Sequence, residues 1–513
     1  MKNVDVVVIG AGNGGLVSAI RVLQQGYSCL VLEKHNIPGG FATSFKRGRF
    51  EFEASLHELN DFGTADNAGD LRVLFDELGV TDKIDWVQSN EAYRLLTLDE
   101  KEPMDVAMPL GVNEYIDAMV KACPESKTSI EKFMNLADEI MRAQAYSNSV
   151  NGNTDSKYMV EHFPNFVRCG SYSVNEVLKV LKMPKKAKDI LSAYWCYLGA
   201  DLDTMSFIHY ASMVYRYLKR KVSIPVNRSH EISLALAERI MELGGEIWYN
   251  SEVTEIVMRG KTVQGVRLAD GTTIGSHHII ANCAPHVVFG KMMKARYVPK
   301  YQLQLANARK FAGRGFTVFL GLNKSAEELG ITHHNYFIYD TNNTVKQYEL
   351  MERIVTNHAQ ATVCLNHALP SCSPKGTCML YMTTLFTSND WKNVTKTDYV
   401  KVKEMVASNL IDAFEKATHT SIRPYIEQIE IATPLTYARY CGHPEGVIYG
   451  YESQYYDGLM PRLLMMQDDA STCPGLRFAG GYSMRLSGYS SAYHSGDIVG
   501  RQTVGDLKKE VQA

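Results

Sequence analysis

Three glycines near the N-terminus carry the clearest chemical signal in this sequence. Gly10, Gly12 and Gly15 follow the pattern GxGxxG. The first glycine permits a tight turn, the second lets the backbone approach a pyrophosphate, and the third lets the next helix pack closely against a strand. Glu33 lies roughly 20 residues further on, where an acidic side chain accepts hydrogen bonds from a ribose. Because a carboxylate there repels a 2′-phosphate, the pattern predicts a dinucleotide with a free ribose 2′-hydroxyl, as in FAD or NAD.

The segments around these residues have the order that such a site needs. A β-branched run, Val6–Ile9, predicts a buried parallel strand that ends at the first glycine. Apolar residues at helical spacing then continue to about Gln25, and Gly26 ends the helix. A second apolar strand over residues 28–32 leads directly to Glu33. Strand, glycines, helix, strand and acid therefore form a βαβ unit whose helix N-terminus faces the diphosphate.

Length and composition narrow the class of protein further. A chain of 513 residues predicts two domains, and its 45% hydrophobic content predicts a folded protein. A formal net charge of −2 gives no global field that would attract nucleic acid. No apolar run reaches the ~18 residues needed to span a bilayer, so we expect a cytoplasmic protein. The ten cysteines form no CxxC pair, which predicts reduced thiols and no metal centre.

The region from about residue 67 to 217 has a different pattern, with helical segments joined by polar connectors. Such an insertion does not belong to the nucleotide-binding sheet, and we expect it to form a cap over one wall of a substrate cavity. The predicted helices are Leu71–Leu78, Val112–Ala122, Ser129–Tyr146, Val174–Leu181 and Ala187–Leu198.

The segment Met205–Leu218 is rich in apolar and aromatic residues, and three basic residues, Lys219, Arg220 and Lys221, follow it directly. Two interpretations stay open. An amphipathic helix with a basic end is typical of peripheral contact with an anionic membrane surface, and it is equally typical of a cap helix whose basic end is solvated.

The second half of the chain alternates between short strands and helices. An Asp270-Gly271 turn predicts a hairpin between Val263–Leu268 and the residues from Thr273 onward. A strand is expected to end at Asn282, and a long helix to run from about Tyr399 to Thr418. Further strands are predicted at Glu246–Tyr249, Val253–Arg259, Thr317–Leu322, Cys378–Leu385 and Leu476–Ala479, and further helices at Ile232–Leu243 and about Ser490–Leu507.

Three stretches resemble a known family. The elements GAGNGG, LEKxxxPGG and RFEFEASLH between Val4 and His57, the central segment ending in HHIIANCAP, and the C-terminal LRFAGGYSMRLSGYSSAYHSGD are similar to the phytoene desaturase family. That family includes carotenoid desaturases, carotenoid isomerases and retinol saturases. The sequence departs from it in two places, since family members usually have more glycine where Asn227–His230 and Met484–Tyr489 stand here. These departures affect the substrate side of the site.

The resemblance implies an α/β fold: a Rossmann-like FAD-binding domain of the glutathione-reductase, amine-oxidase and phytoene-desaturase type, interleaved with an α+β substrate or cap domain. The FAD-binding domain is expected at residues 1–66, 222–298 and 433–513, with a C-terminal helix, and the substrate domain at 67–221 and 299–432. The residues expected to bind FAD are Gly10, Gly12, Asn13, Gly14, Gly15, Glu33, Lys34, Gly39, Gly40, Phe41, Val253, Gly480, Gly481 and Ser490.

We expect an FAD-dependent oxidoreductase that desaturates or saturates a carbon–carbon bond of a hydrophobic isoprenoid, polyene or fatty-acyl-like molecule. An external electron donor or acceptor recycles the flavin, since the chain has one dinucleotide fingerprint. The alternatives are double-bond isomerisation or hydration, a flavoprotein without turnover, and an amine oxidase.

Hydride transfer at a carbon–carbon bond is accompanied by proton exchange, so titratable groups near the flavin are candidate catalytic residues. His57 follows the early strand, and Arg485, Tyr489, Tyr493 and His494 lie near the start of the C-terminal helix. We exclude metal binding by the adjacent pairs His277-His278 and His333-His334, because neighbouring residues on a strand point to opposite faces.

Overall fold

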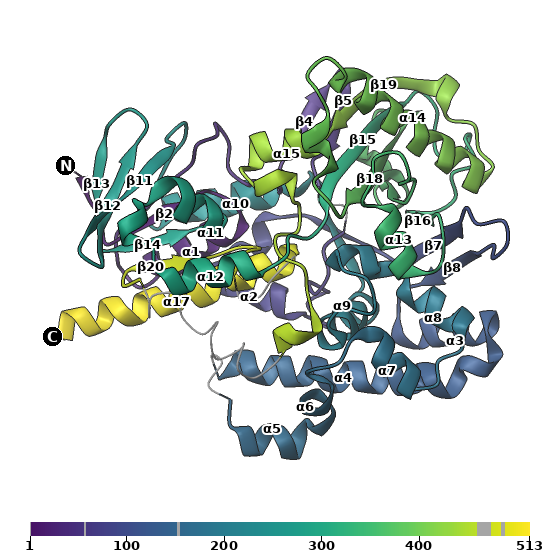
Figure 1. The fold of residues 1–513 in the computed structure, drawn as a ribbon, viewed down its shortest axis with the longest axis horizontal. Helices are drawn as coiled ribbons and strands as arrows, with labels where there is room; N and C mark the ends of the chain where they lie inside the picture. The colour runs from purple at the N-terminus through teal and green to yellow at the C-terminus, as the bar shows by residue number, and fades with distance from the viewer. Residues whose placement is uncertain (1, 56–57, 151–153, 459–472, 484–487, 513) are drawn as a thin grey trace.

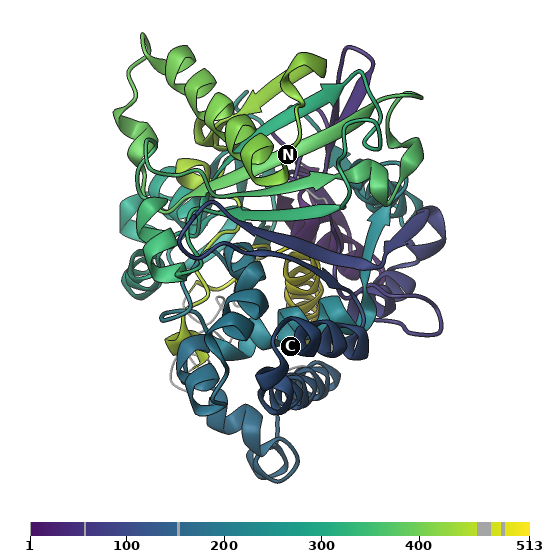
Figure 2. The same ribbon diagram turned by 90° about the vertical axis from the view of Figure 1, so that its right-hand side faces the viewer.

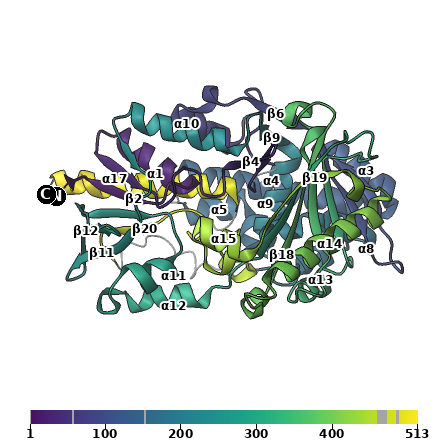
Figure 3. The same ribbon diagram turned by 90° about the horizontal axis from the view of Figure 1, so that it is seen from above.

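A computed structural model of the chain describes residues 2–55, 58–150, 154–458, 473–483 and 488–512. The molecule has two halves, a nucleotide-binding half built on a parallel sheet and a second half built on a large, mostly antiparallel sheet (Figure 3). Helices contributed mainly by residues 112–220 lie beneath both halves in Figure 1.

The nucleotide-binding half has a five-stranded sheet in which every neighbouring pair is parallel. Val6, Val7 and Val8 of its central strand are 0% exposed, as expected for a strand covered on both faces. The strand order is β10 (Glu246–Trp248), β3 (Cys29–Leu32), β2 (Val6–Ile9), β14 (His278–Ala281) and β20 (Leu476–Phe478).

Four helices pack on one face of this sheet: α1 (Asn13–Leu23), α2 (Asp70–Leu78), α10 (Ser229–Glu242) and α17 (Tyr489–Gln512). A small sheet covers the other face, with the order β1 (Lys2–Asn3), β13 (Thr273–Gly275), β12 (Thr262–Leu268) and β11 (Val253–Arg259). Beside it lie α11 (Pro285–Val287), η4 (Val288–Met292), η5 (Ala295–Tyr297) and α12 (Lys300–Ala308). The predicted βαβ unit and the hairpin at Asp270-Gly271 are both confirmed.

The second half has a seven-stranded sheet, whose strands lie one above another in Figure 2. Its order is β19 (Ile426–Ala432), β15 (Arg314–Leu322), β18 (Cys378–Phe386), β17 (Gln360–Cys364), β16 (Asn335–Tyr339), β7 (Glu91–Thr97) and β8 (Asp105–Pro109). Helix α14 (Tyr399–Thr418) packs on one face. The opposite face meets the hairpin β4 (Ser44–Arg47) and β5 (Phe50–Glu53), and also the cap helices.

The cap contains α3 (Val112–Ala122), α4 (Lys127–Ser149), α5 (Ser156–His162), α6 (Pro164–Cys169), α7 (Val174–Val180), α8 (Lys185–Leu191), η3 (Ser192–Leu198) and α9 (Phe207–Arg220). Shorter connecting elements include the strand pair β6 (Trp86–Ser89) and β9 (Val222–Pro225), α13 (Thr344–Leu350) and α15 (Pro434–Cys441).

The fold class is confirmed, with two corrections in the inserted region. The segment from 67 to 217 is not purely helical, because β7 and β8 complete the large sheet and β6 pairs with β9. Helix α9 is a buried cap helix, with Tyr210 and Leu218 at 0% exposure, so it has no free apolar face for a membrane. Its basic end is bound locally: Lys219 bonds to Asp138 and Lys221 to Asn90. The domain boundaries themselves remain predictions.

Candidate functional site

The glycines in the turn between β2 and α1 are needed for two different reasons, one set by the fold and the other by a bound ligand. A Cβ on Gly15 would lie 2.1 Å from the carbonyl oxygen of Gly10, so the fold itself needs the third glycine. Gly12 has an ordinary φ of −82°, and the nearest atom to its Cβ position is the flexible side-chain nitrogen of Asn282, at 2.6 Å. The fold does not need a glycine there, but an approaching ligand does. No side chain caps the N-terminus of α1, which leaves its backbone N–H groups available to an anion.

Asn282 is a residue of this site that the sequence analysis did not single out. It follows β14 directly, and its side chain lies against the Cβ positions of Gly12, Gly14 and Gly480. Ligands of open parallel sheets bind beyond the carboxyl ends of the strands, so its place at the predicted strand end was an available signal.

Glu33 is held at the end of β3 by the backbone on both sides. Its carboxylate accepts hydrogen bonds from the N–H groups of Ala11, at 2.7 Å, and His35, at 2.8 Å. The carboxylate therefore borders the glycine turn, where a ribose hydroxyl can join the remaining lone pairs. Lys34 points elsewhere, with its amine 3.4 Å from the carbonyl oxygen of Arg439.

The turn Gly39–Phe41 lies on another side of this site. Together, the glycine turn, Glu33 and the turn Gly39–Phe41 form what we call the nucleotide cradle. The N–H of Gly39 donates to the carbonyl of Ala11 at 2.7 Å, and the backbone is left-handed at Gly39 and Gly40, with φ of 117° and 61°. A Cβ on Gly39 would lie 2.2 Å from the carbonyl oxygen of Ala42, so this turn requires glycine. Phe41 accepts a hydrogen bond on its carbonyl from the Tyr489 hydroxyl at 3.0 Å, which ties the turn to α17.

Helix α17 completes the cradle by packing unusually close to α1. The Cβ position of Gly496 is 2.3 Å from the carbonyl oxygen of Gly14, and the Ser18 hydroxyl lies 2.6 Å from that oxygen and 3.0 Å from the carbonyl oxygen of Gly496. The N–H of Gly480 donates to the Ser495 hydroxyl at 3.0 Å. The backbones of the two helices therefore touch at Gly14 and Gly496.

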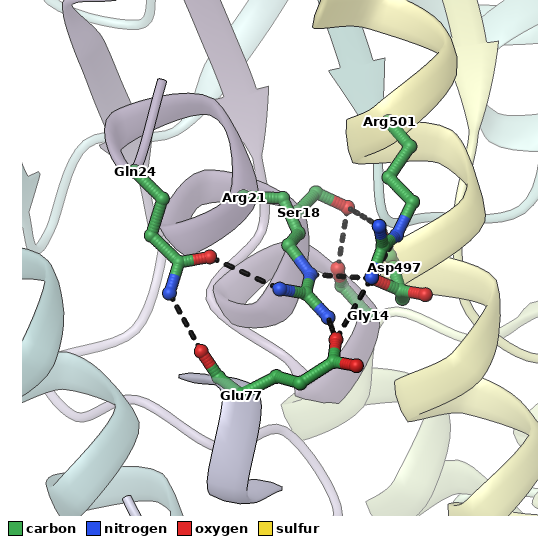
Figure 4. A network of polar contacts seen from close by, with 8 residues as sticks. Gly14, Ser18, Arg21, Gln24, Glu77, Asp497 and Arg501 are labelled. Atoms are coloured by element: carbon green, nitrogen blue, oxygen red, sulfur yellow. Dashed lines mark hydrogen bonds and ion pairs between the residues drawn. The ribbon is translucent and has the colours of Figure 1, made fainter. Parts of the chain in front are cut away.

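Charged residues hold the two helices in this position (Figure 4). Arg21 of α1 forms ion pairs with Asp497 of α17 and Glu77 of α2, and Arg501 bonds to the same two acids. The Arg21 side chain is only 10% exposed, so the pairing is largely shielded from water. The cradle therefore has a rigid rear wall.

The remaining predicted cofactor residues have less specific surroundings. Val253 is 4% exposed in the core of the small sheet. Gly481 lies under the Tyr449 carbonyl, whose oxygen is 3.2 Å from its Cβ position, and Ser490 is half-buried in the first turn of α17. Roles for these residues in binding FAD remain predictions.

The predicted catalytic residues fall into two groups. His57 and Arg485 lie outside the described residues. Tyr489 donates to the Phe41 carbonyl, and Tyr493 is 0% exposed, with its ring packed edge-on against Phe75 at 5.1 Å. Burial raises the pKa of both tyrosine hydroxyls, which weakens them as proton donors. Their catalytic role stays a prediction.

Two buried carboxyl groups of this region were not foreseen. Glu53 is 1% exposed and accepts hydrogen bonds from the backbone N–H and the hydroxyl of Ser229. Burial raises the pKa of Glu53 to about 7, although Ser229 and the Arg228 guanidinium act in the opposite direction. Glu58 is also buried, and burial raises its pKa to about 8. No sequence pattern marks either residue, because their burial comes from segments distant in the chain.

An aromatic cluster lies where η3 and α9 of the cap meet β7 and β16 of the large sheet. Tyr194 stacks on Tyr217 with ring centroids 4.9 Å apart, and Tyr197 packs edge-on against Phe337 at 5.3 Å. Its members are Tyr93, Tyr194, Tyr197, Tyr217, Phe337 and Tyr339. Most of their hydroxyls bond to backbone carbonyls behind the rings, as Tyr194 does to Ala92 and Tyr339 to Ala193. The cluster is largely buried, and its rings pack on one another between the cap and the large sheet.

A cavity of about 20 Å³ borders this cluster, between Tyr339, Tyr449 and residues of β17 and β18. It has room for about one water molecule, so a polyene must displace side chains to enter. Tyr449 lies between this cavity and the Gly481 backbone, which connects the aromatic cluster with the nucleotide cradle.

The described residues contain no group of three or more His, Cys, Asp or Glu side chains that could hold a metal ion. Within the same residues, no helix is both long and apolar enough to cross a bilayer.

Comparison with known proteins agrees with this architecture. Residues 8–78 match the family described as NAD(P)-binding Rossmann-like domain. The chain is 24% identical to the chloroplastic prolycopene isomerase of Daucus carota, over 99% of this chain and 81% of that protein. It is 23% identical to the all-trans-retinol 13,14-reductase of Danio rerio, over 88% of this chain and 78% of that protein.

Two solved structures share the fold. An oxidoreductase from Methanosarcina mazei superposes with a TM-score of 0.64 at 15% identity, covering 98% of this chain and 100% of that chain. Cyclohexylamine oxidase from Brevibacterium oxydans superposes with a TM-score of 0.61 at 16% identity, covering 99% and 100%.

Fold and sequence together indicate an oxidoreductase with a Rossmann-like nucleotide-binding domain. The predicted resemblance to the phytoene desaturase, carotenoid isomerase and retinol saturase proteins is confirmed over nearly the whole chain.

The cradle fits the adenine-dinucleotide part of a flavin cofactor. It combines an uncapped helix N-terminus, a Gly12 whose Cβ position is approached only by the Asn282 side chain, and an acid held at the end of β3. The buried side-chain oxygen of Asn13 has no protein partner, so a polar ligand group can bond to it.

Proposed function

We propose that this chain binds FAD and acts on a carbon–carbon double bond of a hydrophobic polyene or isoprenoid. The observation that carries the proposal is the connection between the nucleotide cradle and the aromatic cluster through Gly481 and Tyr449. Prolycopene and retinol, named in the relatives, are both conjugated polyenes. Aromatic ring faces suit such molecules because they offer large apolar contact area without hydrogen bonds to satisfy.

Each part of the chain has a defined task in this function. The N-terminus of α1 and Gly12 hold the diphosphate, and Glu33 accepts hydrogen bonds from the ribose. Asn282 places an amide beside the same groups. When bound, FAD supplies the acceptor or donor of a hydride. The cap and the large sheet exclude water from the polyene and orient its double bond beside the cofactor.

Saturation or desaturation is the first candidate, and isomerisation is the second. Similarity to a prolycopene isomerase over 99% of the chain supports the second. Isomerisation differs from the first candidate because it changes the geometry of a double bond without net transfer of electrons. An amine oxidase has only the shared fold in its favour.

The test is an anaerobic assay of the purified holoprotein with all-trans-retinol and prolycopene as probes. Oxidised and chemically reduced protein are each mixed with each probe, and the flavin spectrum and product mass are recorded. A product heavier by two hydrogen atoms establishes a saturase, and one lighter by two establishes a desaturase. A rearranged product of unchanged mass establishes an isomerase, and one heavier by a water molecule a hydratase. If protein containing FAD leaves both probes and related polyenes unchanged, the proposed function is wrong.

A further inference from the structure

A buried polar cluster lies beside the aromatic rings and has no part in the nucleotide cradle. It consists of Glu58, His334, Asn335 and Tyr197. The side chains of Glu58 and His334 are 2% and 1% exposed, and Asn335 is 0% exposed. Asn335 Nδ2 lies 3.2 Å from both the Glu58 carboxyl oxygen and the Tyr197 hydroxyl, and that hydroxyl is 3.5 Å from the second Glu58 oxygen.

The hydrogen bonds assign the proton positions. His334 Nδ1 lies 3.2 Å from the carbonyl oxygen of Cys364, which only accepts, so Nδ1 carries the hydrogen. Nε2 is then an acceptor, and it faces Glu58 Oε1 at 3.5 Å without another partner. Burial lowers the pKa of His334 to about 4, which keeps the ring neutral. An uncharged imidazole acceptor favours the protonated form of Glu58.

Two other buried acids, Asp61 and Glu53, have charged neighbours that Glu58 lacks. Asp61 pairs with Arg216, and Glu53 lies beside Arg228. No lysine or arginine in the described part of the chain forms an ion pair with Glu58. The groups facing it are His334, Asn335 and the hydroxyls of the aromatic cluster, Tyr194, Tyr197 and Tyr217. Glu91 also lies beside this cluster, and it accepts a hydrogen bond from the His334 backbone at 2.8 Å.

Tyr197 links Glu58 to the aromatic cluster. Tyr197 is only half-buried, and its ring packs on Phe337. A neutral carboxylic acid beside ring faces is suited to proton exchange with a conjugated double bond. The positive charge created on the polyene is stabilised by the negative side of the aromatic rings and by the new carboxylate.

We propose, on the basis of the proposed function, that Glu58 exchanges a proton with a carbon of the bound polyene, and that His334, Asn335 and Tyr197 position it. The O–H bond of Glu58 breaks, and the electron pair of the double bond forms a C–H bond. Glu58 is left as a carboxylate and the polyene as a delocalised cation. After rotation about the weakened bond, loss of a proton from that carbon restores Glu58 and yields an isomer with no change in oxidation state. In saturation, a hydride donor completes the second C–H bond, and water reprotonates Glu58.

The first experiment measures the proton on Glu58 without using turnover. Infrared difference spectra compare the wild-type holoprotein with Glu58→Gln between pH 5 and pH 10. We expect the C=O band of a protonated carboxylic acid that disappears around pH 8 in the wild type and is missing from the variant, beside a Glu53 band that disappears around pH 7 in both proteins. Glu452→Gln is the control, since Glu452 is another buried glutamate bonded to a tyrosine, Tyr348, and its substitution leaves the Glu58 band in place. A wild-type spectrum without the Glu58 band overturns the proposal.

The second experiment measures proton transfer with prolycopene and all-trans-retinol in D₂O. Wild-type protein and Glu452→Gln are expected to place solvent deuterium in the product, up to one atom for each bond that reacts. Glu58→Gln should bind the probes with wild-type affinity but lose roughly 100-fold or more in turnover and deuterium incorporation. Partial recovery in Glu58→Asp separates proton transfer from packing. Deuterated product formed by Glu58→Gln at the wild-type rate refutes the role of Glu58. If wild-type protein converts no polyene, both the proposed function and this role of Glu58 are wrong. If wild-type protein converts a polyene and Glu58→Gln does so equally well, only the role of Glu58 is wrong.

Discussion

The contact between α1 and α17 offers a sharp test of how the cradle is held together. Replacing Gly496 with alanine adds a Cβ 2.3 Å from the carbonyl oxygen of Gly14 and 2.9 Å from its Cα. Carbon atoms do not approach backbone oxygen so closely, and this backbone belongs to the first turn of α1. Helix α17 must therefore move away from α1, which also strains the hydrogen bond from Ser18 to the Gly496 carbonyl.

The change in the free energy of unfolding caused by Gly496→Ala follows from two opposing effects. Overpacking of a tight interface destabilises a protein by about 1–3 kcal/mol. Alanine stabilises a helix interior by up to about 1 kcal/mol relative to glycine. Gly505→Ala isolates the second effect, because Gly505 lies in the same helix and nothing lies within 4 Å of its Cβ position. We expect Gly505→Ala to be slightly stabilising and Gly496→Ala to be less stable than this control by about 1–3 kcal/mol.

The assay compares thermal unfolding and flavin content of the two variants and the wild type. Gly496→Ala should unfold at least a few degrees below Gly505→Ala, since about 1 kcal/mol shifts the midpoint of a large domain by roughly 2–4 °C. It should also retain less FAD, because α17 carries Ser495, which bonds to the Gly480 N–H. Equal unfolding temperatures and full flavin content in both variants would refute the reasoning.

Four further outcomes are expected. Gly12→Ala should fold normally, since φ there is −82°, yet lose at least tenfold in FAD affinity; a normal flavin absorbance after dialysis would contradict the cradle. Glu33→Gln should weaken FAD binding by about 10–100-fold in a titration, because a charged acceptor is worth about 1.5–3 kcal/mol, and unchanged affinity would remove its ribose role. Tyr489→Phe should cost about 1 kcal/mol of stability, through the lost bond to the Phe41 carbonyl, with less than tenfold change in turnover; a 100-fold loss would instead identify the hydroxyl as a proton donor. Burial raises the folded-state pKa of Glu58 to about 8, so the folded state binds more protons and the wild-type free energy of unfolding should fall between about pH 5 and 8 through this group. Glu58→Gln should flatten that slope by up to about 1.4 kcal/mol per pH unit, and denaturant unfolding with an unchanged slope would show that the carboxyl titrates normally.

The nucleotide half of the fold was predictable because its signals are local. Gly10, Gly12 and Gly15 each meet a requirement set by neighbours within a few residues of the chain or by the ligand itself, and the βαβ unit follows from hydrophobic periodicity. Helix α14 begins and ends at the predicted residues, Tyr399 and Thr418, for the same reason. Strands β7 and β8 were missed because their burial pattern does not alternate strictly, and β16, which pairs with β7, lies far along the chain.

The sequence by itself determined a dinucleotide cradle, its acid and the helices that frame it, since each depends on the conformational freedom of glycine or on spacing along one element. Tertiary structure alone decided which polar groups meet. Glu58 and Asn335 are separated by 277 positions, and Arg21 and Asp497 by 476, yet each pair is in hydrogen-bond contact. The chemistry of such pairs depends on burial and on the neighbour that packing supplies. Neither property can be predicted from the residues that flank them in the sequence.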